Sequence, residues 1–119
     1  MTNIDTIRSI LIVAQSKTQR DLMRLFFGAR GFDVETVAGA CEAIIKFESG
    51  YFDLVLTDLQ SPKCGGNRLA LHFHDTGRSV PMIAMTSEES HAHPHHRMVM
   101  QKPFRMESLV QAIQSLATA

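Results

Sequence analysis

The fold is decided by residues 51–62, which read YFDLVLTDLQSP. An apolar run at 54–56 follows a glycine at position 50, and Thr57, Asp58 and, further on, a proline come after it. A run this short is typical of a strand buried on both faces, as in parallel sheets. Asp58 then lies at or just past the carboxyl end of the strand, where open α/β sheets gather their chemistry. Taken alone, the stretch fits a turn or helix-cap aspartate equally well.

The rest of the chain alternates strand and helix patterns around this segment. Apolar or alternating runs predict further strands at 9–13, 32–37, 80–86 and 98–101. Apolar residues at helical spacing predict helices from 16 or 17 to 29, and over 40–49, 67–75 and 106–116. In the first helix the spaced residues are Leu22, Leu25, Phe26 and Ala29. Because alternating elements imply right-handed crossovers, we predict an α/β, doubly wound, flavodoxin-like parallel sheet of five strands in one domain, 1–119.

The overall composition argues against several classes of protein. The 12 Lys and Arg residues balance the 12 Asp and Glu residues, so the net charge gives no reason to expect nucleic acid or an anionic membrane as partner. No apolar run is long enough to cross a bilayer, and the first residues lack the pattern of a signal peptide. Cys41 and Cys64 have no motif spacing, so we expect free thiols in a reducing cytoplasm.

Four groups of residues occur in an order that carries a family resemblance. They are Ile10 to Val13, then Asp58 with Pro62 and Gly66, then Thr86, and finally Lys102 with Pro103 and Phe104. With these marks spread over nearly its whole length, the chain resembles the response-regulator receiver domains of two-component signalling. The resemblance implies that Asp58 accepts a phosphoryl group from a histidine kinase or phosphotransfer protein. It also implies that Thr86 and Lys102 contact the phosphoryl oxygens, and that the chain is a signalling module and not an enzyme.

The chemistry of these residue types agrees with the implied roles. A carboxylate such as that of Asp58 is a competent phosphoryl acceptor. Transfer needs in-line positioning and positive charge for the equatorial oxygens, which Lys102 can supply, and the Thr86 hydroxyl can donate a hydrogen bond. Thr86 alone could instead cap a following helix, and Lys102 could be a plain surface cation. Three matches at three strand ends favour the functional interpretation.

The first departure from the family concerns the metal. In the family, two adjacent acidic residues after the first strand hold a divalent ion, whereas Ala14 and Gln15 stand here. Mg²⁺ prefers carboxylates, and Ala14 offers no ligand atom while Gln15 offers only a neutral carbonyl. Asp58 and Gln60 remain as the ligands of a weak magnesium site. We therefore expect impaired magnesium-dependent phosphorylation of Asp58, leaving the chain to act through protein–protein contacts.

Two further departures and a histidine cluster lie in the second half of the chain. The stretch between Thr86 and Lys102 is short and contains Pro94, so the family's fourth helix is expected to be shortened or irregular. Val99 stands where the family usually has an aromatic switch residue. Histidines crowd this region at positions 72, 74, 91, 93, 95 and 96. Imidazoles at this density can bind zinc, copper or nickel, but their spacing favours a solvated polar loop.

Alternative functions differ in what they require at the strand ends. A conventional receiver would have to bind magnesium in spite of Ala14 and Gln15. A flavin- or nucleotide-binding protein of the same fold would need a phosphate-binding loop after the first strand, and residues 14–18 contain no glycine. An output domain, another protein or a second copy in a homodimer stay open as partners, and residues 98–100 are a candidate contact surface.

Overall fold

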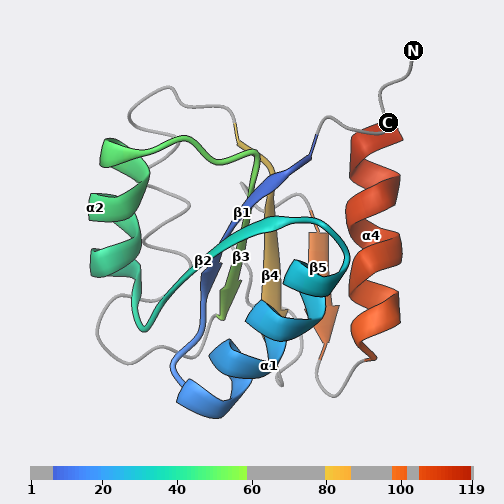
Figure 1. Ribbon diagram of the computed structural model, residues 1–119, viewed down its shortest axis with the longest axis horizontal. Helices are drawn as coiled ribbons and strands as arrows, with labels where there is room; N and C mark the ends of the chain where they lie inside the picture. Colours follow the sequence, from blue (N-terminus) through green and yellow to red (C-terminus); the bar gives the residue numbers. More distant parts are fainter. Residues whose placement is uncertain (1–6, 59–79, 87–97, 102–104, 119) are drawn as a thin grey trace.

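The computed structural model describes residues 7–58, 80–86, 98–101 and 105–118. Within them, five strands form one parallel sheet, namely β1 (Ser9–Val13), β2 (Asp33–Val37), β3 (Leu54–Asp58), β4 (Met82–Thr86) and β5 (Met98–Gln101). Three helices accompany it, namely α1 (Lys17–Ala29), α2 (Ala40–Ser49) and α4 (Met106–Thr118). The strand order β2-β1-β3-β4-β5 is that of a doubly wound, flavodoxin-like sheet. The predicted fold class is therefore confirmed (Figure 1).

The element bounds follow the predicted ones closely, with small differences. The strand predicted from 80 begins at Met82, since Pro81 has no N–H for the ladder and contributes only its carbonyl, which accepts from the Val55 amide at 3.1 Å. The last helix runs two residues further than predicted, to Thr118. The predicted helix at 67–75 and the shortened helix within 87–97 lie outside the described residues. No helix in the described ranges combines the length and apolar character needed to cross a membrane.

Alternation along the strands builds one apolar core on each face of the sheet. On one face, residues of β1, β3 and β4 pack against α1 and α4, with Met23, Phe27, Leu109 and Ile113 as the helical contribution. On the other face, a smaller cluster packs against α2 through Ala43 and Phe47. Figure 1 shows α2 on one side of the sheet and α1 and α4 on the other. Because both faces are covered, the central strands are apolar throughout, as the run at 54–56 indicated.

Helix α1 is confirmed, but the buried face differs from the predicted set. Its buried residues are Met23 and Phe27, which lie one turn apart and face the sheet. Of the predicted set, Phe26 is partly buried against the core, whereas Leu22 and Leu25 are 56% and 72% exposed and Ala29 is exposed. The helix carries two apolar stripes with the same period, and only the stripe that the sheet covers is buried.

Asp53 joins the amino-terminal ends of β1 and β3. Its amide donates to the Ser9 carbonyl at 2.8 Å, and its Oδ2 accepts from the amides of Arg8 at 2.9 Å and Ser9 at 3.0 Å. Burial raises the pKa of Asp53, but hydrogen bonds from Ser9, Arg8 and the Tyr51 hydroxyl outweigh it, so that the net pKa lies below its ordinary value. The bond to Asp53 raises the pKa of Tyr51. This clasp lies at the amino edge of the sheet, opposite the edge where Asp58 ends β3.

Strand β2 is an outer strand of the sheet and is largely polar. Asp33 and Glu35 are exposed, and Lys46 of α2 lies 3.2 Å from the Glu35 carboxylate. Arg24 of α1 donates from Nη2 to the Thr36 hydroxyl. The two flanking helices therefore hold β2 in place through polar side chains, since its alternating burial leaves little apolar surface for the purpose.

Candidate functional site

The carboxyl ends of four strands meet at one edge of the sheet and bring the candidate positions together. Val13 pairs with Thr57, so Ala14 and Asp58 are the next residues on adjacent strands. Asp58 pairs with Met85, and Thr86 follows at the end of β4. Thr86 in turn pairs with Gln101, the last residue of β5 and the neighbour of Lys102 in the sequence. The backbones of Asp58 and Thr86 therefore end side by side, as the sequence predicted, while the predicted positions Gln60 and Lys102 lie outside the described residues.

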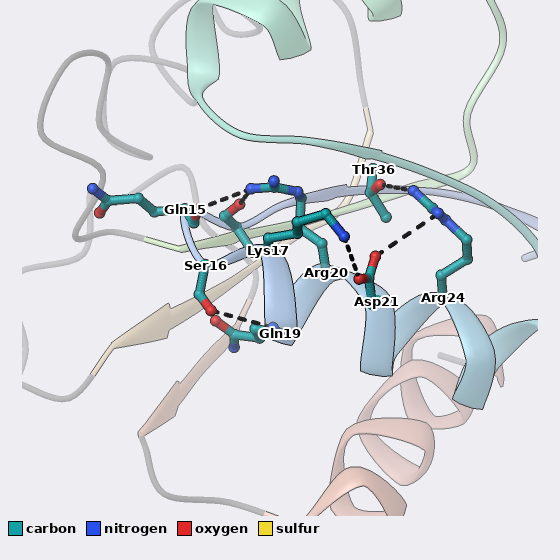
Figure 2. Close-up of polar contacts among 9 residues, drawn as sticks. Gln15, Ser16, Lys17, Gln19, Arg20, Asp21, Arg24 and Thr36 are labelled. Atoms are coloured by element: carbon teal, nitrogen blue, oxygen red, sulfur yellow. Dashed lines mark hydrogen bonds and ion pairs between the residues drawn. The ribbon is translucent and has the colours of Figure 1, made fainter.

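The end of β1 carries no acidic side chain. Ala14 is fully buried, and its amide donates to the Val37 carbonyl at 3.1 Å. The Gln15 side chain is exposed. Their two carbonyls accept from Nη1 of Arg20, at 2.8 Å for Ala14 and 2.9 Å for Gln15 (Figure 2). A methyl group, a neutral amide and a bound guanidinium do not fit a divalent cation, which seeks carboxylate oxygens.

Asp21, the nearest acid on α1, is occupied by neighbouring cations. Its carboxylate lies 2.9 Å from Nζ of Lys17 and 4.0 Å from Nη1 of Arg24, and Figure 2 shows it turned toward these two residues. The hydrogen bond from Lys17 lowers the pKa of Asp21. Asp21 therefore does not replace the missing acidic pair. Among the described residues, no group of three His, Cys, Asp or Glu side chains is placed to hold a metal ion.

Helix α1 begins beside this edge with a serine N-cap and with basic instead of acidic residues in its first turn. The Ser16 hydroxyl accepts from the Gln19 amide at 3.3 Å, which starts the helix at Lys17. Acidic residues are favoured in a first turn because of the helix dipole, yet α1 has none there. Lys17 and Arg20 instead add positive charge to the positive end of the helix dipole.

Two features of this region were not predicted from the sequence. One is Arg20, whose side chain reaches back to the strand end and binds backbone carbonyls there, a contact that no residue pattern in the sequence indicates. The other is the fully buried Thr57, whose hydroxyl has no hydrogen-bond partner within the part of the chain that the structure describes. Thr57 directly precedes Asp58 in β3.

Cys41 corrects the expectation of free thiols. It lies exposed in the first turn of α2 and is disulfide-bonded. The chain's other cysteine, Cys64, lies outside the described residues. The spacing of the two cysteines in the sequence gave no sign of this disulfide.

Several further predictions concern residues that the structure does not describe at the side-chain level. The six histidines and Pro94 lie outside the described ranges, so the histidine-loop and helix predictions stay predictions. Val99 lies in β5, paired with Ala84, and only its backbone is described. The contact surface predicted at 98–100 falls on the same strand.

Comparisons with known proteins agree on one family. Residues 10–114 match the model of the response regulator receiver domain. The transcriptional regulatory protein CiaR of Streptococcus pneumoniae is 32% identical over 90 residues, which are 71% of this chain and 40% of CiaR. The sensor protein EvgS of Escherichia coli is 28% identical over 79 residues, 66% of this chain and 7% of EvgS. The chain thus spans less than half the length of these two relatives.

Solved structures support the same assignment at the level of the fold. The response regulator protein TrrA of Thermotoga maritima, crystallised in complex with Mg(2+)-BeF, superposes with a TM-score of 0.84 at 23% identity, covering 92% of this chain and 99% of TrrA. Such an identity bears on the fold alone, but the family model covers most of the sequence. The chain belongs to the response regulator receiver domain family.

Proposed function

We propose that this chain is a signalling receiver module of a two-component phosphorelay in which Asp58 is the phosphoacceptor. The observation that carries the proposal is the strand register, which ends β3 at Asp58 beside Ala14 and Met85 and ends β4 at Thr86. In an open parallel sheet this edge is where ligands and reacting groups gather. A histidine kinase or a phosphotransfer protein is the donor in this proposal.

The proposed roles follow from the chemistry of phosphoryl transfer. A carboxylate oxygen of Asp58 forms a bond to phosphorus as the bond to the donor's leaving group breaks. Negative charge is then spread over three equatorial oxygens, which the Lys102 ammonium stabilises and to which the Thr86 hydroxyl donates a hydrogen bond. In this proposal residues 1–119 form one receiver domain, which is a signalling module and not an enzyme and which acts in the cytoplasm. It transmits its phosphorylation state to an output domain, another protein or a second copy of the chain.

The proposal includes impaired magnesium-dependent phosphorylation of Asp58. Ala14 and Gln15 replace the acidic pair, which leaves Asp58 and Gln60 as ligands of a weak site. Arg20 supports this point, since its guanidinium binds the two carbonyls at the place of the missing acids. A conventional magnesium-dependent receiver is the alternative that the experiment below separates.

Phosphorylation can be tested with acetyl phosphate and with a phosphorylated phosphotransfer protein, followed by intact-protein mass spectrometry. We expect the wild-type chain to gain one phosphoryl group slowly, with little effect of magnesium, and Asp58→Asn to gain none. Asp33→Asn, at the opposite edge of the sheet, is the matched control and should be labelled like wild type. Thr86→Ala and Lys102→Met should each slow labelling by roughly tenfold or more, because each removes a group that stabilises the transferred charge.

Three results would contradict parts of the proposal. Equal labelling of Asp58→Asn would show that another residue is the acceptor. No labelling of wild type by either donor would refute the acceptor role itself. Rapid, stoichiometric labelling that requires magnesium would contradict the impairment and establish the conventional receiver instead.

A further inference from the structure

The disulfide of Cys41 lies at an exposed place in the fold. Cys41 is the second residue of α2, which begins at Ala40, and it is exposed to solvent. The sequence contains two cysteines, so within one chain the bond of Cys41 is to Cys64. Along the sequence, the bond therefore closes a loop that contains most of α2, all of β3 and Asp58.

This disulfide meets two conditions for reversible reduction. Cys41 is exposed, so a thiol reductant can approach it, and exposed disulfides are more often labile or regulatory than buried ones. The bond is also not needed to hold α2 on the sheet, because the buried side chains of Ala43 and Phe47 do so. In the cytoplasm, where the proposed function places this chain, disulfides are usually transient, catalytic or redox-sensing.

The start of α2 favours the reduced form of Cys41. The N-cap residue is Gly39, which has no side chain to accept from the amides of the first turn. These amides and the helix dipole give positive potential, which stabilises a cysteine thiolate at a helix N-terminus. Glu42, the acid of this turn, opposes the effect only in part, because its Oε1 accepts from the Ala38 amide at 3.1 Å. A stabilised thiolate makes the disulfide easier to reduce.

From these observations we propose that the disulfide of Cys41 is a reversible redox switch, which stabilises the fold when oxidised and withdraws that stabilisation when reduced. The reductant is a dithiol, whose sulfurs form a disulfide with each other as the bond between Cys41 and Cys64 breaks. The dithiol gives up an electron pair, and its protons pass to the cysteine sulfurs. The switch acts on the closed loop and does not require Asp58 to carry a phosphoryl group.

The test begins with the full chain equilibrated with oxidised glutathione. Its intact mass should be lower than that of the reduced protein by the hydrogens lost in bond formation, and iodoacetamide should label no cysteine. Glutathione buffers of graded composition should then open and close the bond reversibly. Reduction should lower Tm by at least about 5 °C, because a crosslink restricts the unfolded chain. Cys41→Ser and Cys64→Ser should both have the Tm of reduced wild type in every buffer.

Gly39→Asp tests the contribution of the α2 N-terminus. It places a carboxylate at the N-cap, so the equilibrium constant for reduction should fall by about two- to fivefold. Gly39→Asn is the matched control, since it caps the helix without a charge and should change the constant less. Both side chains fit the backbone, because Gly39 is extended, with φ −152° and ψ 168°.

Several results would overturn the switch. They are a disulfide between two copies on a non-reducing gel, glutathione attached to Cys41 in place of the internal bond, and a Tm that reduction leaves unchanged. A bond that no glutathione buffer opens would show a purely structural disulfide. An unchanged equilibrium constant in Gly39→Asp would refute the role of the helix. Failure of the proposed phosphorylation would be seen separately, in the labelling of Asp58→Asn.

Discussion

Replacing Asp53 by asparagine tests the clasp that joins the amino-terminal ends of β1 and β3. The carboxylate oxygen accepts from the amides of Arg8 and Ser9, and asparagine keeps an acceptor but loses the charge that strengthens both bonds. Hydrogen bonds to a charged group contribute about 1.5–3 kcal/mol when buried. Because Arg8 is exposed and Asp53 only half-buried, solvent screening reduces the expected loss to about 1–2 kcal/mol in the free energy of unfolding. For a domain of this size that loss lowers Tm by roughly 3–8 °C.

The pH dependence of the same variant provides a sharper measurement. The folded-state pKa of Asp53 lies below its ordinary value, so its stabilisation is fully present above the unfolded-state pKa, near 3.9. The stabilisation is lost as the pH falls through the folded-state pKa. In urea titrations from pH 7 into the acid range, the difference in the free energy of unfolding between wild type and Asp53→Asn should therefore shrink. At the acid end the two free energies should be equal.

Asp33→Asn is the control for a general effect of removing an acid. Asp33 is exposed, and its carboxylate has no hydrogen-bond partner in the described ranges, so the free energy of unfolding should change by less than about 0.5 kcal/mol. The reasoning would be refuted by equal stabilities of wild type and Asp53→Asn at pH 7. A difference between them that persisted unchanged into the acid range would refute the assigned pKa direction.

Three further tests, made with four variants, concern features described above. Thr57→Val should raise the free energy of unfolding by about 1 kcal/mol in urea titrations, because the buried hydroxyl lacks a partner among the described residues; a loss would mean that the hydroxyl is satisfied. Phe27→Ala should lower the free energy of unfolding by about 3–5 kcal/mol, whereas Leu25→Ala should change it by at most about 0.5 kcal/mol. Similar losses of stability in the two variants would contradict the assignment of Phe27 to the buried face of α1. Ala14→Asp with Gln15→Asp should create a magnesium-dependent rise in Tm, about 1.4 kcal/mol of stabilisation at ten times the dissociation constant, that wild type lacks; an equal response in both proteins would contradict the assigned role of this pair.

The backbone of this protein was largely predictable because its signals are local. Strand β5 has the predicted bounds, and α2 ends at Ser49, just before Gly50, as a glycine after an apolar helical pattern indicates. The edge that holds Asp58 followed from parallel topology, which places all carboxyl strand ends together. These inferences need only the period of the apolar residues and the residues that stop each element.

The side-chain environment was less predictable because it depends on contacts across the fold. Two apolar stripes on α1 have the same period, and only packing on the sheet decides that Phe27 and not Leu25 is buried. The disulfide of Cys41 is not indicated by any motif spacing of the cysteines in the sequence. Arg20 binds backbone carbonyls, which every residue possesses, so no pattern of residue types announces the contact.

The two outer strands of the sheet differ in how they would receive another chain. Strand β2 carries charged side chains, the exposed Asp33 and Glu35 with its partner Lys46, which disfavour a second copy laid alongside it, whereas β5 reads MVMQ and has no charged residue. If two copies pair through their β5 strands, both outer strands of the joined sheet are charged β2 strands, so a third copy is not added. Overexpression or heating should therefore favour closed pairs joined through β5 over open-ended fibres, and a lysine placed in β5 should suppress them.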